Sequence, residues 1–199
     1  MEPSATLAVV GKAKQLKREG KPVISFGAGE PDFDSPPAAI RYAKEAIDAG
    51  HTHYTQATGI PELKEAVTDY YEKRFNLSFS ADQVIVGAGA KPLIYSALSC
   101  LVDPGDEVIV FSPAWVSYVE QIMLCGGEAA VVNTIPSGCV PDPEKVRQVV
   151  THKTRGMLIN SPNNPTGAVY DSETLQALVK IAEENDLGSF TTKFTRGWY

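Results

Sequence analysis

The pattern of hydrophobic and polar positions changes its period along the chain. Continuous apolar runs predict buried strands, whereas apolar stripes that recur at helical spacing predict amphipathic helices. Strands are expected at residues 83–86, 107–111, 128–132 and 155–160. Helices are expected at residues 3–20, 37–49, 61–75, 92–101, 143–150 and 171–186. Strands that alternate with helices of this length predict an α/β fold, with a largely parallel sheet covered by helices on both faces.

The last of these strands ends in a loop that carries two asparagines, Asn163 and Asn164. Pro162 and Pro165 lack the N–H group that a continued strand would need, so the ladder is expected to stop there. Ligands of open α/β sheets bind at the carboxyl ends of the strands, and an asparagine amide at that edge can donate to a ligand oxygen. The alternative is an ordinary strand-to-helix loop closed by asparagine turns.

A glycine-rich turn, residues 87–91, lies between the first predicted strand and a helix whose first turn is expected to open with Pro92. This arrangement is a general cradle for anions, because free N–H groups and the helix dipole both favour a phosphate. The turn lacks the third glycine of the dinucleotide fingerprint and the Gly-Lys-Ser/Thr sequence of a P-loop. The alternative is a glycine turn that binds no ligand.

Two aromatic residues and one glycine segment lie in loops where a ligand could reach them. Trp115 follows the strand at 107–111, so its indole could stack on a heteroaromatic ring or simply pack in the core. Tyr54 lies in a polar segment and could donate to a phosphate oxygen, although lone loop tyrosines are more often half-buried. Residues 27–33 contain Gly29, beside which an anionic group could approach backbone donors; an ordinary turn is the alternative.

Composition excludes several classes of protein. The 199 residues are 43% hydrophobic and carry a net charge of −6, which argues against a nucleic-acid interface built from clustered Lys and Arg. The sequence has no run of 18 apolar residues and no signal-peptide core, so we expect a cytoplasmic protein without a membrane segment. The histidines lack metal-ligand spacing, and Cys100, Cys125 and Cys139 are expected to be reduced thiols.

Three strand ends therefore offer a phosphate cradle, an aromatic ring and an amide, which together suit a phosphorylated aromatic cofactor. The sequence resembles the pyridoxal-phosphate-dependent aminotransferases of fold type I, class I, in particular the bacterial and plant-type aspartate aminotransferase branch. The resemblance covers about residues 3–187, in family order, and includes the stretches PSATLAV, GAGEPDFDSP, YTQATGIPELKEAV, VIVGAGAK, DPGDEVIV, SPAWVSY, VPDPEKV and NSPNNPTGAVY.

The resemblance implies a cofactor, pyridoxal 5′-phosphate, and a role for each matched residue. Ala90 and its neighbours Gly89 and Lys91 would bind the cofactor phosphate through backbone N–H groups. Trp115 would stack on the pyridine ring, and Asn164 would donate to its 3-oxygen. Two further implied contacts involve other partners: Tyr54 would reach the cofactor of the neighbouring subunit in a homodimer, and Gly29 would contact the substrate carboxylate. The implied reaction transfers an amino group from an amino acid to a 2-oxo acid.

The last residues, 188–199, depart from the family pattern. They contain no acid, whereas the family has a strand there with an aspartate for the pyridine nitrogen. The family's Schiff-base lysine, two arginines and the small C-terminal domain find no match in this chain. We therefore expect an incomplete three-layer α/β/α large domain with no assigned catalytic residue: an N-terminal arm at 1–30, a partial cofactor-binding domain at 31–187 and a divergent tail at 188–199.

Such a fragment has consequences for stability and function. The strand at 84–86 would lose its ladder partners, at about 1–3 kcal/mol for each buried unpaired backbone group. We expect a poorly cooperative fragment that is inactive alone and associates through exposed strand edges. A non-catalytic binding or dimer-interfering role is the alternative to a disrupted aminotransferase. Aspartate with 2-oxoglutarate is the substrate pair expected from branch resemblance alone, and aromatic precursors such as prephenate are the alternative substrates.

Overall fold

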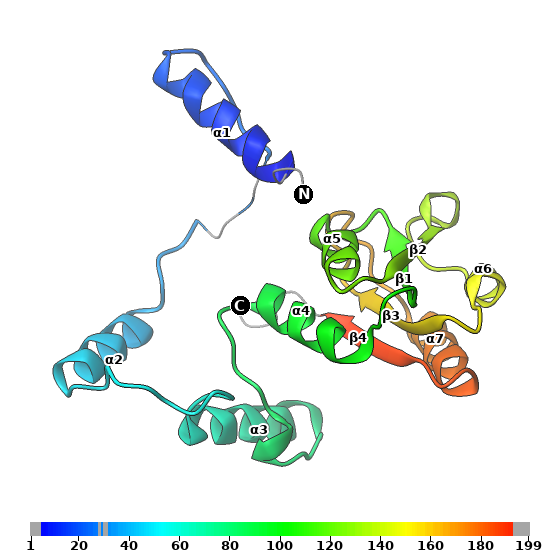
Figure 1. Ribbon diagram of the computed structural model, residues 1–199. Helices are drawn as coiled ribbons and strands as arrows, with labels where there is room; N and C mark the ends of the chain where they lie inside the picture. Colours follow the sequence, from blue (N-terminus) through cyan, green and yellow to red (C-terminus); the bar gives the residue numbers. More distant parts are fainter. Residues whose placement is uncertain (1–4, 28, 30–31, 193–199) are drawn as a thin grey trace. The chain divides into compact units, whose positions relative to one another are not determined.

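Figure 1 shows the computed structural model of the chain, which describes residues 5–27, 29 and 32–192. The chain divides into two compact units, residues 1–55 and 56–199, and each unit is described by itself. This division differs from the boundaries at 30 and 187 expected from the sequence, which stay predictions. Within the described ranges, no helix is both long and apolar enough to cross a bilayer.

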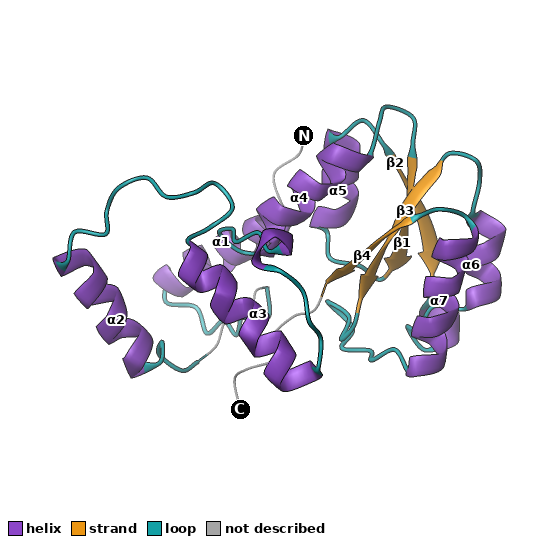
Figure 2. Cartoon of the chain, turned by 90° about the horizontal axis from the view of Figure 1, so that it is seen from below, coloured by secondary structure: helices purple, strands orange, loops and turns teal. Residues whose placement is uncertain are grey.

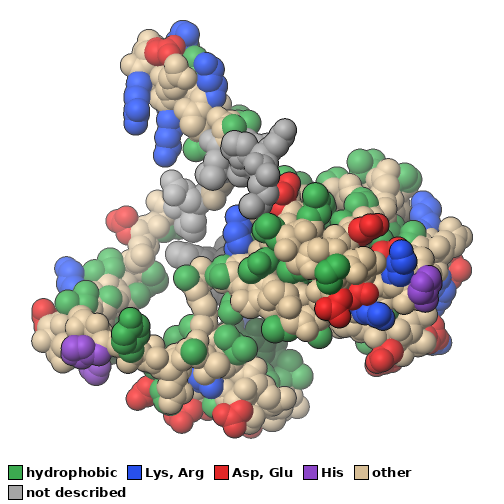
Figure 3. All heavy atoms as spheres, viewed as in Figure 1, with side chains coloured by type: hydrophobic (Ala, Val, Ile, Leu, Met, Phe, Trp, Pro, Cys, Tyr) green, Lys and Arg blue, Asp and Glu red, His purple; other side chains and the backbone are tan. Residues whose placement is uncertain are grey.

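The first unit contains two helices, α1 (Ala5–Arg18) and α2 (Pro37–Asp48). Both match the predicted helices, although residues 3 and 4 lie outside the described part. The spacing of Ile40, Ala43 and Ile47 along α2 predicts that these residues face inward, and this prediction is wrong. Ile40 and Ile47 are 40% and 64% exposed, and Ala43 is also exposed. Amphipathic spacing marks the face that a partner would cover, but no described element of this unit covers it. Figure 3 shows hydrophobic side chains exposed on α2 and Lys and Arg side chains projecting from α1.

The second unit begins with α3 (Pro61–Phe75), which coincides with the predicted helix. Its aromatic residues pack against one another, and the ring of Tyr71 lies 5.4 Å from the rings of both Phe75 and Phe79. Two short 3₁₀ helices, η1 (Ala81–Gln83) and η2 (Ile135–Ser137), occur in the loops of this unit. The aromatic contacts hold the end of α3 to the chain that follows it.

The centre of the second unit is a parallel sheet of four strands in the order β2-β1-β3-β4. The strands are β1 (Glu107–Ser112), β2 (Glu128–Asn133), β3 (Thr154–Asn160) and β4 (Gly188–Thr192). Every pairing is parallel, so all four carboxyl ends lie at one edge of the sheet. The α/β class and the strands predicted at 107–111, 128–132 and 155–160 are confirmed.

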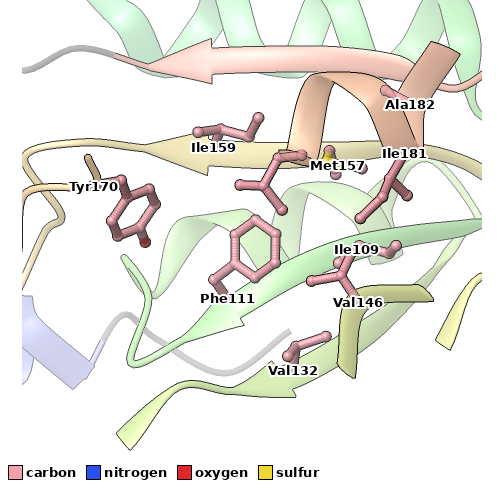
Figure 4. Packing of buried hydrophobic residues seen from close by; sticks show 10 residues of the cluster. Ile109, Phe111, Val132, Val146, Met157, Ile159, Tyr170, Ile181 and Ala182 are labelled. Atoms are coloured by element: carbon pink, nitrogen blue, oxygen red, sulfur yellow. The ribbon is translucent and has the colours of Figure 1, made fainter. Parts of the chain in front are cut away.

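Helices cover both faces of the sheet (Figure 2). On one face lie α4 (Ala90–Leu101) and α5 (Ser117–Leu124), and on the other lie α6 (Pro143–Val149) and α7 (Ser172–Glu184). Side chains of β1 alternate between the two cores: Val108 and Val110 pack with α4 and α5, whereas Ile109 and Phe111 pack with α6 and α7. Figure 4 shows this second core, with Phe111 between strand and helix side chains. A strand that is apolar on both faces needs both layers of helices.

One predicted strand, residues 83–86, is wrong. Gln83 ends η1, and residues 84–86 are extended but do not belong to the described sheet. Val86 donates its N–H to the Thr58 carbonyl at 3.0 Å, and the Ile85 side chain is exposed. An apolar run becomes a strand only where another strand is present to pair with it. The expectation that this segment lacks ladder partners therefore agrees with the sheet order.

Strand β4 extends the sheet five residues into the segment that the sequence assigned to the divergent tail. Gly188 pairs with Gly156 of β3, and Phe190 packs against the α4–α5 core. The remaining tail, residues 193–199, lies outside the described residues. The strand forms there because β3 offers a ladder and the adjacent core accepts Phe190, and neither condition is visible in the local sequence.

The close approach of β3 and β4 predicts a position where a methyl group is not tolerated. A Cβ at Gly156 would lie 2.5 Å from the Gly188 carbonyl oxygen, so Gly156→Ala is expected to cost about 1–3 kcal/mol. Amide hydrogen exchange should show faster exchange in β4. Gly188→Ala is the matched control, because its Cβ would make only ordinary contacts at 3.4 Å or more. Equal exchange in the two variants would contradict this account of the pairing.

Candidate functional site

The glycine-rich turn leads into the N-terminus of α4, two residues earlier than the sequence predicted. Gly89 is the N-cap with φ +91°, a left-handed conformation that favours glycine, and Ala90 and Lys91 open the helix instead of Pro92. The N–H groups of the first helical residues have no acceptor within the helix. A Cβ at Gly89 would meet no heavy atom within 4 Å, so an anion has room to approach these donors.

The indole of Trp115 lies next to this helix end. The Lys91 ammonium nitrogen is 4.9 Å from the centroid of the Trp115 ring, so the cation lies over the ring. Trp115 also packs edge-to-face with Tyr118 at a centroid distance of 5.3 Å and an interplanar angle of 86°. The half-buried indole also contacts the α4–α5 core, so the packing role and the proximity to the anion cradle occur together.

The two asparagines of the loop after β3 have different environments. Asn163 is buried, and its side-chain oxygen accepts hydrogen bonds from the Thr166 hydroxyl at 2.9 Å and the Thr166 N–H at 3.2 Å. Asn164 is half-buried, and its N–H donates to the Asn160 side chain at 2.7 Å. Within the described residues, the side-chain amide of Asn164 has no hydrogen-bond partner. Asn163 therefore organises the loop, and Asn164 is able to meet a ligand.

Parallel pairing brings the indole and the amide to the same edge of the sheet. Strands β1 and β3 are neighbours in parallel register, with Val110 opposite Leu158. Trp115 follows the end of β1, and Asn164 follows the end of β3. The Lys91 ammonium contacts the Trp115 ring, so the start of α4 and the indole are neighbours. That these residues and Asn164 form one cofactor site stays a prediction.

The remaining candidates, Gly29 and Tyr54, belong to the first unit. Tyr54 is fully exposed and lines an open pocket with Thr52 and His53, so the half-buried packing alternative is wrong. Gly29 is exposed, and a Cβ there would meet no atom within 4 Å. Its neighbours Ala28, Glu30 and Pro31 lie outside the described residues. The roles of Gly29 and Tyr54 toward a substrate and a neighbouring subunit stay predictions.

The local environment shifts the pKa values of two titratable groups near the asparagine loop. Burial raises the pKa of the Tyr170 phenol, which the hydrogen bond from the Asn163 amide partly offsets. Hydrogen bonds from Thr174 lower the pKa of Asp171, the N-cap of α7.

The three cysteines are free thiols. Among the described side chains, no group of three His, Cys, Asp or Glu residues is placed to hold a metal ion.

Sequence reasoning missed a buried polar residue beside this site, Gln121. Its side-chain amide donates to the Lys91 carbonyl oxygen at 2.7 Å. Gln121 shares one face of α5 with Tyr118 and Ile122. This helical spacing was a signal in the sequence from which burial of Gln121 could have been predicted.

The fold and these contacts define a parallel α/β domain whose strand-end loops suit a phosphorylated aromatic ligand. Residues 21–190 match the sequence profile of the aminotransferase class I and II family. The chain belongs to that family, whose members normally use pyridoxal 5′-phosphate.

Three relatives illustrate the similarity. The chain is 46% identical over 187 residues to the aspartate/prephenate aminotransferase of Thermus thermophilus, covering 94% of this chain and 49% of that protein. It is 40% identical over 188 residues to the aspartate aminotransferase of Bacillus subtilis, covering 94% and 48%. The structure of Thermus thermophilus aspartate aminotransferase with maleate matches at a TM-score of 0.93 and 44% identity, covering 97% of this chain and 51% of that one. The chain thus spans about half the length of these relatives.

The contrast between the adjacent asparagines gives a paired prediction. Asn163→Ala should accelerate amide exchange at Thr166 and Gly167, because it removes both Thr166 bonds and opens a buried site. Asn164→Ala should leave that exchange unchanged and weaken the binding of pyridoxine 5′-phosphate about fivefold, the effect of one lost hydrogen bond. The exchange rates and a fluorescence titration measure the two effects. The distinction fails if Asn164→Ala disturbs the loop as strongly as Asn163→Ala.

Proposed function

We propose that the second unit of this chain forms the phosphate- and ring-binding part of a pyridoxal-phosphate-dependent aminotransferase. The observation that carries the proposal is the contact between Lys91, at the start of α4, and the Trp115 ring. In a chain that belongs to an aminotransferase family, this contact supports a site in which the N–H groups at the start of α4 bind a phosphate beside the indole ring.

The residues present fit this cofactor chemically. The N–H groups at Ala90 and Lys91 can donate to phosphate oxygens, and the positive end of the α4 dipole favours the dianion. The open space at Gly89 leaves the approach clear. The Lys91 ammonium adds a positive charge close to the ring, and the Asn164 amide supplies a donor at the end of β3. Each group thus matches a different part of a phosphorylated pyridine.

In the proposed role, the chain binds and orients, while the cofactor carries the reactive chemistry. When bound, pyridoxal phosphate supplies an aldehyde carbon and an electron-withdrawing ring through which an amino acid can lose its amino group and α-proton. Ala90 and Lys91 would hold the phosphate end, Trp115 would support the ring, and Asn164 would donate to the 3-oxygen. Asn163 keeps the Asn164 loop in place through Thr166. Rigid placement of this kind lowers the entropy cost of aligning the reacting atoms.

The substrates and assembly follow from similarity to the named relatives. Their names specify aspartate and prephenate aminotransferases, so we propose an amino acid such as aspartate as donor and a 2-oxo acid as acceptor. Gly29 would contact the substrate carboxylate. In a homodimer, Tyr54 would reach the cofactor phosphate of the neighbouring subunit, for which its fully exposed side chain is suited.

Binding of the phosphate group tests the proposal directly. Pyridoxine 5′-phosphate and pyridoxine differ only in the phosphate, and neither carries an aldehyde that could react with surface lysines. The chain has two tryptophans, so Trp198→Phe leaves Trp115 as the fluorescent reporter. We expect quenching of Trp115 by both ligands, with the phosphorylated ligand binding at least about tenfold more tightly through charge-assisted hydrogen bonds.

A substitution at the helix start provides the matched control. Ala90→Pro removes one phosphate donor, yet proline is well tolerated at the first position of a helix. The variant should keep its helix content by circular dichroism and lose much of its preference for the phosphorylated ligand. If the unsubstituted chain shows no such preference, or if Ala90→Pro retains all of it, the proposed phosphate site is wrong.

A further prediction concerns catalysis by the 199-residue polypeptide alone. The family's Schiff-base lysine and pyridine-nitrogen aspartate have no match in this sequence, so neither a general base nor a stabilised electron sink is supplied. We expect no transamination of aspartate with 2-oxoglutarate. An amino-acid-dependent change in the absorption spectrum of added pyridoxal phosphate, above a control without protein, would refute this expectation.

A further inference from the structure

Gln121 lies in the interior of the second unit, on the face of α5 that packs against α4. Its side chain is 5% exposed, and its amide nitrogen donates to the Lys91 carbonyl oxygen at 2.7 Å across a separation of 30 residues. Its side-chain oxygen is buried and has no hydrogen-bond partner among the residues that the structure describes. A buried amide with one half unpaired is unusual, because desolvation of the unpaired oxygen is unfavourable.

The stability of the fold does not explain why a glutamine occupies this buried position. The Lys91 carbonyl belongs to the first turn of α4, where helix carbonyls accept a hydrogen bond from the N–H four residues later. It would therefore have a partner without Gln121. The unpaired oxygen offsets much of what the single hydrogen bond contributes, so an apolar side chain of similar size would serve the fold equally well.

The hydrogen bond between Gln121 and Lys91 does constrain the position of α4 relative to Trp115. Lys91 joins three parts of the proposed site: its peptide N–H belongs to the anion cradle, its carbonyl is held by Gln121, and its ammonium lies over Trp115. Gln121 belongs to α5, which begins two residues after Trp115. Apolar contacts of Ile94 and Leu98 with Tyr118 and Ile122 hold the two helices together. Such contacts are non-directional and leave the rotation and slide of α4 less defined than a directional hydrogen bond does.

We propose that Gln121 is a positioning residue that holds the first turn of α4 in register with Trp115, so that one ligand can meet both the phosphate donors and the indole. The inference rests on the proposed phosphate site and extends it to a residue that does not touch the ligand. It predicts that removal of the Gln121 amide affects recognition of the phosphate and leaves recognition of the ring unchanged.

The test replaces Gln121 with a side chain of similar size that cannot donate, Gln121→Met, in the Trp198→Phe background. Titration of Trp115 fluorescence with pyridoxine 5′-phosphate and with pyridoxine measures the preference for the phosphate. We expect the affinity for the phosphorylated ligand to fall about fivefold, as for one lost positioning hydrogen bond, and the affinity for pyridoxine to stay constant. Amide exchange in the middle of α4 should not accelerate.

Ile122→Val is the matched control for loss of packing. Ile122 is the next residue of the same helix and fully buried, so the variant should accelerate exchange in α4 and α5 without changing the ratio of the two affinities. The inference is overturned if Gln121→Met keeps the wild-type ratio, or if it weakens both ligands equally while α4 exchange accelerates.

The two proposals fail in distinguishable ways. Absence of any phosphate preference in the unsubstituted chain would overturn the phosphate site and the role of Gln121 with it. A phosphate preference that is lost in Ala90→Pro but retained in Gln121→Met would leave the site intact and overturn only the positioning role.

Discussion

Parallel pairing of β1 with β3 is the constraint on which the rest of this structure depends. It aligns the carboxyl ends of two buried strands, so the loops that follow them start at the same edge of the sheet. Trp115 and Asn164 are brought to one rim although they lie far apart in the sequence. The apolar side chains of these two strands project from both faces of the sheet, which is why α4 and α5 pack on one side and α6 and α7 on the other.

In each part of the candidate site, one residue supports the local structure and another has a group that could contact a ligand. The side-chain oxygen of Asn163 accepts hydrogen bonds from Thr166 within the loop. The side-chain amide of its neighbour Asn164 has no partner among the described residues. Trp115 is anchored against Tyr118 and receives the Lys91 ammonium over its ring. Gln121 donates its amide N–H to the Lys91 carbonyl oxygen, and no described group pairs with its side-chain oxygen. Under the proposed function, the geometry of the site would depend in part on packed residues that do not themselves touch a ligand.

Two apolar segments of the chain have little packing among the described residues. Residues 84–86 have an apolar strand pattern without a ladder in the described sheet, and Ile85 is exposed. The apolar stripe of α2 is likewise uncovered within its unit. Both segments have the composition of elements that pack against something, and hydrophobic surface of this kind favours association.

Local sequence determined where most helices and three of the strands lie, because periodicity and capping act within a few residues. Asp142 caps α6 by accepting from the Glu144 N–H, and Asp171 caps α7 in the same way through Thr174. Tertiary structure decided that residues 84–86 are not a strand, that β4 forms beside β3, and that Lys91 meets both Gln121 and Trp115. These outcomes depend on partners distant in the chain, and a ladder or a buried contact exists only when both sides are present.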